Sequence, residues 1–391
     1  MAELGEIINK YSDLAISYRR HFHKYPELSN SETETTIKIA EILTKMGITA
    51  QKHDGNGVTA IISGNSPGRC IALRCDIDAL PISETTSLPF GSVHSDVCHA
   101  CGHDMHIAIL LGAAHVLNEM RGLLSGSIKL IFQPAEEDQL NCGAIRMIEH
   151  GVLENPKVDA IIALHVWPQY KTGSAAIRDG AMMASTDLFK MTVKGKKGHG
   201  SAPEDCVDAI AIASSIITSM QTIVSRNVSP HSSSVISVGK INGGSRYNII
   251  ADKVELEGIC RTLDPKVRDI LPKLIERTAT GVAQAMGGEC DIEYFTGYPP
   301  TINNYDMFNL TYGVMKDVLG QNALIAPNSS LSSEDFSYYC EQVPGAYFWL
   351  GVQNPNEPFS PLHNSSFSPD EAAIRYGIEI MAKSAITFLN K

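Results

Sequence analysis

The feature that most narrows the folds open to this chain is an alternation of strand-like and helix-like segments in its first half. Segments 70–74, 127–132 and 158–164 are short and apolar, as expected of buried strands, and helix-like segments lie between them. Segment 107–117 is apolar on nearly every face, so we expect a buried helix there. The alternation predicts an α/β fold with a mixed, mostly parallel open sheet flanked by helices.

The pattern changes from about residue 185. Strand-like segments 189–194, 233–241, 253–260 and 290–294 alternate with helix-like segments 205–225 and 267–286. This order is typical of a ferredoxin-like unit, a four-stranded antiparallel sheet with two helices on one face. We therefore predict a catalytic domain in two parts, residues 1–184 and 298–391. An inserted α+β satellite domain, residues 185–297, interrupts it.

Polar side chains follow three of the predicted strands in the first half. They are Asp76 and Asp78, Glu136 and Glu137, and His165. In open sheets of this kind, functional groups gather at the carboxyl ends of the strands. The sequence therefore predicts a functional site at this edge of the sheet.

Cys101 and His103 add a thiol and an imidazole two residues apart. In extended backbone both side chains point to the same side, and Gly102 lets the chain fold closely around an ion. A core cysteine beside a helix-terminal histidine is the plainer interpretation of such a pair alone. Further candidate ligands in separate segments favour a metal site, and the five form a mixed sulfur, nitrogen and oxygen set: Cys101, His103, Glu137, His165 and His363. Five ligands exceed the four of a closed zinc site, which indicates two ions.

Glu136 and Glu137 stand side by side just past a strand. Adjacent residues in extended chain project to opposite sides, so one carboxylate can bind a metal while the other faces water or substrate. A free carboxylate beside a metal can accept a proton from water and later give it to a leaving amine. The pair predicts hydrolytic chemistry, and an exposed acidic turn is the plain alternative.

Charge and composition exclude several partners. The net charge is −11, which argues against nucleic acid or an anionic membrane as the main partner. We see no apolar run long enough to cross a bilayer and no leader-like N-terminus. Nine cysteines without a short repeated spacing suit reduced thiols better than a disulfide framework, so we expect a cytoplasmic protein that acts on a small molecule.

Five motifs in this order resemble one known family. They are Arg74–Pro81, His99–Asp104, Gln133–Glu137, Ala163–His165 and Leu362–Asn364. The family is that of dinuclear metallo-amidohydrolases and peptidases: aminoacylases, hippurate hydrolases, indole-acetyl-amino-acid hydrolases, N-acetyldiaminopimelate deacetylases and related carboxypeptidases. The resemblance runs from about Arg19 to the last predicted helix.

The resemblance implies roles for the matching residues. It implies that the five candidates are ligands of two divalent ions and that Cys101 bridges the two ions. Zn or Mn are the expected metals, and the donor set also allows Co or Ni. Glu136 resembles the general base, and Asp78 an aspartate that orients a ligand. The broader family has a histidine ligand where this chain has Asp76, which matches the cysteine-containing aminoacylase branch and leaves Asp76 without a role. We assign the remaining histidines, His106 among them, mostly to structural or solvated roles.

In the predicted satellite domain, His199 resembles the family's oxyanion-stabilising histidine, which often acts across a homodimer formed by satellite domains. A solvated loop residue is the alternative, and Glu204 departs from the histidine usual at its position. Asn248 and Arg261 resemble contacts to a substrate carboxylate, which an arginine fork can pair with bidentately. An ordinary salt bridge is the alternative for Arg261.

These observations predict a metal-dependent amidohydrolase that cleaves the amide bond of N-acyl amino acids. A dipeptidase or carboxypeptidase using the same dinuclear site is one alternative. A binding or regulatory protein that keeps the metal and lacks turnover is another, although such a protein would not need the free carboxylate of Glu136. A segment around His23, Pro26 and Glu27 also matches the family, without a chemical role.

Overall fold

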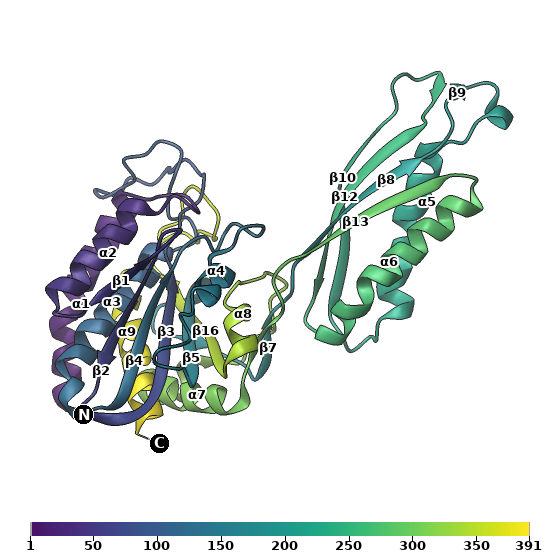
Figure 1. Ribbon diagram of the computed structural model, residues 1–391. Coiled ribbons are helices and arrows are strands. Elements are labelled where there is room, and N and C mark those ends of the chain that lie inside the picture. The colour runs from purple at the N-terminus through teal and green to yellow at the C-terminus, as the bar shows by residue number, and fades with distance from the viewer. Residues whose placement is uncertain (1, 391) are drawn as a thin grey trace. The chain divides into compact units, whose positions relative to one another are not determined.

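The structure is a computed structural model that describes residues 2–390 (Figure 1). The chain forms two compact units. The core unit comprises the chain up to Met182, Ile302–Asn328 and the chain from Asp335 onward, and the satellite unit comprises Met183–Thr301 and Ser329–Glu334. The insertion that we placed at 185–297 thus lies within a unit that also takes in a second, short segment far along the chain.

Within residues 2–390, the core unit contains one eight-stranded sheet in the order β1-β2-β4-β3-β5-β16-β6-β15. Its strands are β1 (Ala50–His53), β2 (Gly57–Ser63), β3 (Ser66–Asp76), β4 (Ser125–Gln133), β5 (Ala160–Lys171), β6 (Ala175–Ala176), β15 (Leu324–Ile325) and β16 (Gly345–Gln353). Strands β4, β3, β5 and β16 are parallel, whereas β1, β2 and β6 supply antiparallel pairs. The mixed sheet predicted from the alternation is confirmed.

The helices of the core unit are α1 (Ala2–Lys24), α2 (Thr33–Lys45), α3 (His103–Glu119), α4 (Gly143–Glu149), α7 (Tyr305–Leu319), α8 (Ser337–Gln342) and α9 (Ala373–Leu389). Helix α3 packs against α1, α9 and β3, and nearly all of its side chains are buried. Each buried leucine of such a helix contributes about 1.5–3 kcal/mol through removal of apolar surface from water. The buried helix predicted over 107–117 is therefore present and begins at His103.

Gly102 sets where α3 starts. Its φ of +84° lies in the left-handed region, and an added Cβ would come within 2.4 Å of the Val166 side chain on β5. Only glycine combines this backbone conformation with so close an approach. The packing of α3 against the sheet therefore brings Cys101 and His103 next to the part of β5 that carries Val166.

The satellite unit contains, in the described chain, a four-stranded antiparallel sheet in the order β10-β12-β8-β13. Its elements are β8 (Asp187–Lys194), β9 (Gly198–His199), α5 (Ala209–Thr222), β10 (Ser234–Gly243), β11 (Ile249–Ile250), β12 (Lys253–Thr262), α6 (Pro265–Ala285) and β13 (Glu289–Thr296). Helices α5 and α6 pack on the sheet around a separate apolar core, and Asp208 and Asp264 cap their N-termini. The predicted ferredoxin-like arrangement is present.

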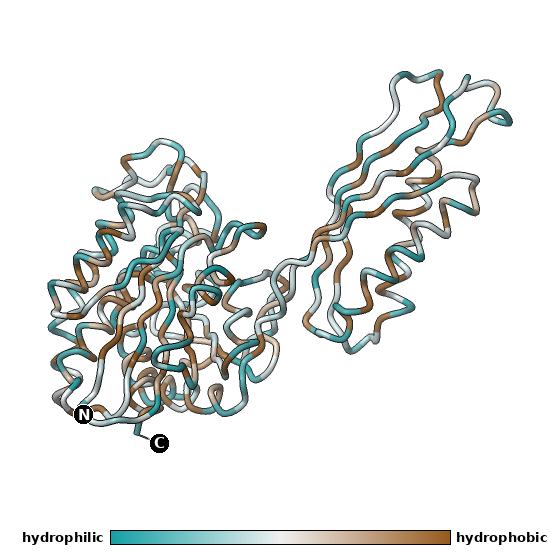
Figure 2. Tube along the Cα trace, in the orientation of Figure 1, coloured by the Kyte–Doolittle hydropathy of each residue, from teal (hydrophilic) through white to brown (hydrophobic). Residues whose placement is uncertain are grey.

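The remaining elements are short. Strands β7 (Gly180–Met183) and β14 (Thr301–Asn303) pair with each other, and helical turns occupy Arg121–Leu123, Pro203–Asp205, Ile223–Asn227 and Gln321–Ala323. Figure 2 shows apolar stretches along the strands of each unit. None of the helices described between residues 2 and 390 is long and apolar enough to cross a membrane.

Candidate metal centre

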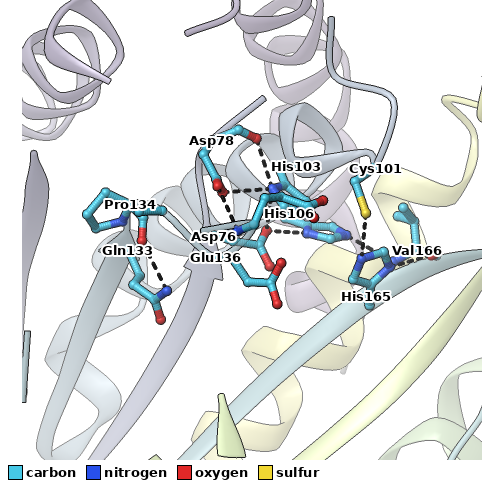
Figure 3. A network of polar contacts seen from close by, with 12 residues as sticks. Asp76, Asp78, Cys101, His103, His106, Gln133, Pro134, Glu136, His165 and Val166 are labelled. Carbon is cyan, nitrogen blue, oxygen red and sulfur yellow. Dashed lines mark hydrogen bonds and ion pairs between the residues drawn. The ribbon is translucent and has the colours of Figure 1, made fainter. Parts of the chain in front are cut away.

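The predicted site residues of the core unit meet at the carboxyl ends of the central strands. Asp76 is the last residue of β3 and lies opposite Gln133, the last residue of β4. The segment 134–137 follows β4 directly. His165, which we predicted at the end of a strand, lies instead within β5, which continues to Lys171. Figure 3 shows these side chains converging from the strand ends and from the start of α3.

The sulfur of Cys101 lies between two imidazoles. It is 3.3 Å from Nε2 of His165 and 3.2 Å from Nε2 of His363. Oε1 of Glu137 is 3.2 Å from the same nitrogen of His363 and 4.0 Å from Nε2 of His103. The ligand atoms thus form two groups that share the cysteine: Cys101, His103 and His165, and Cys101, Glu137 and His363.

Hydrogen bonds orient two of these imidazoles toward the cluster. Nδ1 of His103 contacts the backbone oxygen of Asp78 at 2.9 Å, and Nδ1 of His165 contacts the backbone oxygen of Val166 at 2.6 Å. A carbonyl oxygen can only accept, so each Nδ1 carries a proton and Nε2 is the ring nitrogen left to face the cluster. Buried metal-ligating histidines are commonly oriented in this way.

The buried polar atoms of the cluster fit a cation. In the described part of the chain, Nε2 of His103 is buried and has no hydrogen-bond partner, although a polar atom is costly to bury alone. Burial lowers the pKa of His103, but the carboxylates of Asp76, Asp78 and Glu137 outweigh it and raise the pKa to about 10. The excess negative charge that draws a proton to this imidazole would equally attract metal ions.

Burial shifts the pKa values of the Cys101 thiol and the His165 imidazole in opposite directions, and each shift favours the neutral form. Burial, followed by the negative charges of Glu137 and Glu136, raises the pKa of the Cys101 thiol well above its ordinary value. Burial lowers the pKa of His165 well below its ordinary value, which keeps that ring neutral. A neutral imidazole and a cysteine that ionises only beside a cation are typical of a soft, nitrogen- and sulfur-rich metal site.

Asp78 connects the two sides of the cluster. Its Oδ1 accepts from Nδ1 of His103 at 3.1 Å, and its Oδ2 accepts from the backbone N–H of Glu137 at 2.9 Å and from the hydroxyl of Ser29 at 2.7 Å. One buried carboxylate therefore orients an imidazole on α3 and the backbone that carries Glu137. This geometry supports the orienting role that the resemblance implies.

A tight turn presents Glu136 and Glu137. Ala135 has a φ of +52°, in the left-handed region, and its N–H donates to Oε1 of buried Glu32 at 2.7 Å. Asn30 donates to Asp138 at 2.9 Å on the far side of the turn. The segment between α1 and α2 therefore holds the turn in place through Glu32 and Asn30.

Sequence reasoning also missed a buried ion pair beside Glu136. Arg74 donates to Oδ1 of Asp335 at 2.6 Å, and Gln133 donates to Oδ2 at 2.7 Å. The backbone N–H of Asp335 in turn lies 3.4 Å from Oε1 of Glu136. No local signal marks Asp335 in the sequence, because its partners lie about 200 residues away along the chain.

The structure treats the three predicted satellite residues differently. The backbone N–H of Gly200, next to His199, donates to the backbone oxygen of Asn248 at 3.0 Å, so this histidine and asparagine lie on adjoining segments. Both side chains are exposed. Arg261 lies instead toward the other end of β12, where it donates to the hydroxyl of Ser333 at 2.8 Å. Within the satellite unit, Arg261 is therefore apart from the other two.

Comparison with known proteins identifies the family. The model described as peptidase family M20/M25/M40 matches residues 72–387, which include all five candidate ligands. The chain belongs to peptidase family M20/M25/M40. The resemblance drawn from the five sequence motifs is thereby confirmed, and this M20/M25/M40 chain is a metal-dependent hydrolase of amide bonds.

Individual members of peptidase family M20/M25/M40 match over nearly their full length. The chain is 41% identical over 381 residues to the N-acetyl-L-cysteine deacetylase of Bacillus subtilis, covering 96% of this chain and 88% of that protein. It is 39% identical over 393 residues to thermostable carboxypeptidase 1 of Saccharolobus solfataricus, covering 100% and 99%. The crystal structure of Bacillus subtilis YXEP, a dinuclear metal-binding peptidase of the M20 family, matches with a TM-score of 0.86 at 34% identity, covering 98% and 99%.

Proposed function

We propose that this protein hydrolyses the amide bond of small N-acyl amino acids and releases a carboxylic acid and a free amino acid. The observation that carries the proposal is the pair of ligand groups sharing Cys101, with Glu136 next to the ligand Glu137. We propose Cys101, His103, Glu137, His165 and His363 as the residues that hold two divalent ions. The similarity to an N-acetyl-L-cysteine deacetylase supports this substrate class.

Divalent ions held there would supply Lewis acidity to the substrate carbonyl and lower the pKa of a nearby water. The carboxylate of Glu136 takes the proton from that water and later passes it to the leaving nitrogen. Only 8% of Glu136 is exposed, so bulk water does not compete freely for its proton. Asp78 holds His103 and the backbone of Glu137, and so keeps both proposed ligands in place.

The donor set bears on the metal. Thiolate and imidazole favour zinc, whereas the carboxylate of Glu137 and an open two-ion site also suit manganese, cobalt or nickel. We propose zinc or manganese as the resident ions.

We further propose that the satellite residues act on the substrate. Nδ1 of His199 accepts the backbone N–H of Ser201 at 3.2 Å, which leaves the proton on Nε2, where it can be donated to a developing oxyanion. Asn248 and Arg261 are the proposed contacts to the substrate carboxylate, and because they lie apart within one satellite unit, they would come from different protomers of a homodimer. The homodimer through satellite units and a cytoplasmic location complete the proposal, and the free state of all nine cysteines supports that location.

The test is release of free amino acid from N-acetyl, N-benzoyl and indole-acetyl amino acids and from dipeptides. The protein is first stripped with chelator and then reloaded with Zn²⁺ or Mn²⁺. Metal-dependent cleavage of an N-acyl amino acid is the expected result. Cleavage of dipeptides alone would overturn the proposal in favour of the peptidase alternative. The similarity to a carboxypeptidase is the reason to include dipeptides in the test. No cleavage of any substrate with either metal would overturn it.

A further inference from the structure

Asp76 and His106 form a buried pair beside the proposed ligands, and neither has a part in the proposed chemistry. His106 is the fourth residue of α3 and Asp76 the last of β3, and both are almost fully buried. Nδ1 of His106 lies 2.5 Å from Oδ1 of Asp76, and Nε2 lies 2.9 Å from the backbone nitrogen of Val166 (Figure 3). Both ring nitrogens are therefore in use within the protein.

These contacts assign the proton on the ring. A backbone N–H can only donate, so Nε2 of His106 accepts from Val166. The ring proton then sits on Nδ1 and is donated to Asp76, whose other oxygen accepts from Arg74 at 2.9 Å. Asp76, His103 and His106 also cluster closely enough to suggest a metal group. His106 has no nitrogen left for an ion, so we do not read this cluster as a metal site.

The course of β5 explains why Val166 needs this partner. The last residues of β3 and β5 that pair in the described chain are Arg74 and Ala163, whereas β5 continues alongside β16 as far as Trp167 and beyond. Past Ala163, β3 thus offers no carbonyl to the backbone of β5. A buried N–H without an acceptor is strongly disfavoured, and His106 supplies the acceptor in place of a strand.

Val166 is also the residue that orients His165. Its backbone oxygen accepts from Nδ1 of His165 at 2.6 Å, which turns Nε2 of that ring toward the sulfur of Cys101. His106 thus binds the N–H of Val166, and the carbonyl of Val166 in turn orients the proposed ligand His165. Asp76 holds His106 in the tautomer that this requires.

We propose that Asp76 and His106 are positioning residues that aim His165 at the metal cluster through the backbone of Val166. The proposal rests on the proposed function, because it takes His165 to be a ligand. It also gives Asp76 a role: where the broader family has a histidine ligand, this carboxylate acts on a proposed ligand through three hydrogen bonds in series.

The test compares His106→Ala, His106→Gln and Asp76→Asn with the unaltered protein. The amide oxygen of a glutamine at position 106 can accept the N–H of Val166, so this variant should restore what alanine loses. His115→Ala is the matched control, because His115 lies on the same helix and bonds only to Tyr18 at 3.0 Å among the contacts described. The affinity of metal-free protein for Zn²⁺ is measured by competition with a chromophoric chelator, together with the melting temperature, kcat and KM.

We expect His106→Ala to weaken zinc binding about 10–100-fold and to lower kcat with little change in KM. His106→Gln should recover most of the affinity, Asp76→Asn should lie between, and His115→Ala should bind zinc like the unaltered protein. Unchanged affinity in His106→Ala would overturn the proposal, as would a folded His106→Gln no better than alanine. If the alanine variant does not fold, unchanged zinc affinity in both His106→Gln and Asp76→Asn would overturn it.

The zinc measurement needs no substrate, so it separates the two proposals. Tight zinc binding by the unaltered protein without amide cleavage would defeat the proposed function and leave the positioning role testable. Cleavage with unaltered metal affinity in all three variants would defeat only the positioning role.

Discussion

The proposed ligands of the core unit and the proposed substrate contacts of the satellite unit are held in opposite ways. Cys101, His103 and His165 are buried. The backbone oxygen of Asp78 fixes the His103 ring, and that of the adjacent Val166 fixes the His165 ring, while the N–H of Val166 is bound by His106 on α3. His199 and Asn248 are exposed, and the contacts of the His199 ring come from Ser201 in its own loop. The comparison teaches that contacts within the folded core unit orient the proposed metal ligands, whereas the two satellite side chains are exposed on the surface of their unit.

His363 is an intermediate case within the core unit. Its side chain is 54% exposed, although Nε2 contacts both Cys101 and Glu137. Its backbone has a φ of +58° and its N–H donates to the backbone oxygen of Ala100, which ties the loop to the cysteine segment. The exposed side chain of this proposed ligand, beside buried ones, leaves one side of the cluster open to solvent.

The largest expected effect concerns the buried side of the comparison. Glu136→Gln keeps the shape of the side chain and removes its ability to take a proton, so kcat should fall about 10²–10⁴-fold. Zinc affinity should stay within a few-fold of the unaltered protein, because Glu136 is not a proposed ligand. Steady-state kinetics and chelator competition measure both, with exposed Glu149→Gln as the control. Full activity in Glu136→Gln would rule out the proposed proton transfer.

The exposed side is tested by His199→Ala. Removing one donor to an oxyanion should lower kcat about 10²–10³-fold, and the melting temperature should not change because the ring is exposed. His231→Ala, another exposed histidine of the satellite unit, should leave kcat unaltered. If both variants keep full activity, His199 is a solvated loop residue. The comparison would then be between a functional site in the core unit and an ordinary surface of the satellite unit.

The Asp78→Asn substitution tests how strongly metal binding depends on the hydrogen bonds that Asp78 makes to His103 and Glu137. Both carboxylate oxygens of Asp78 accept hydrogen bonds, so an amide NH₂ must face a donor on one side. Zinc affinity should therefore fall about 10–100-fold, measured by chelator competition. Exposed Asp54→Asn is the control. Unchanged affinity would show that His103 and Glu137 keep their places without this carboxylate.

The smallest effect is on stability and its pH dependence. Burial and nearby Asp78 raise the pKa of Glu32 from 4.5 to about 7. Between these values the folded protein keeps a proton that the unfolded chain releases, so this contribution to stability is present below pH 4.5 and is lost as pH rises through about 7. Glutamine stays neutral and can still accept from Ala135. Glu32→Gln should therefore gain about 2–3 kcal/mol relative to the unaltered protein between pH 5 and pH 8.

Urea unfolding at the two pH values measures this difference. Exposed Glu34→Gln, two residues further along the chain in α2, should show no such gain. Equal pH dependence in Glu32→Gln and the unaltered protein would mean that Glu32 titrates as an ordinary exposed carboxyl despite its burial.

Local patterns predicted much of the fold. The apolar strand-like segments and the shift in pattern near residue 185 sufficed for the mixed sheet and the ferredoxin-like unit, because both depend on periodicity within single elements. The short segment Ser329–Glu334 escaped prediction, because it joins the satellite unit only by contacts with residues far away in sequence.

By itself the sequence determined which reactive groups are present: a thiol and an imidazole separated by Gly102, two adjacent carboxylates after a strand, a histidine in an apolar strand and a histidine in a late loop. Only the tertiary structure decided which side chains support them. The sequence assigns His106 only a structural or solvated role and leaves Asp76 without a role. The positioning roles proposed for them depend on where β3 stops beside β5, and that is set by packing between segments far apart in the chain.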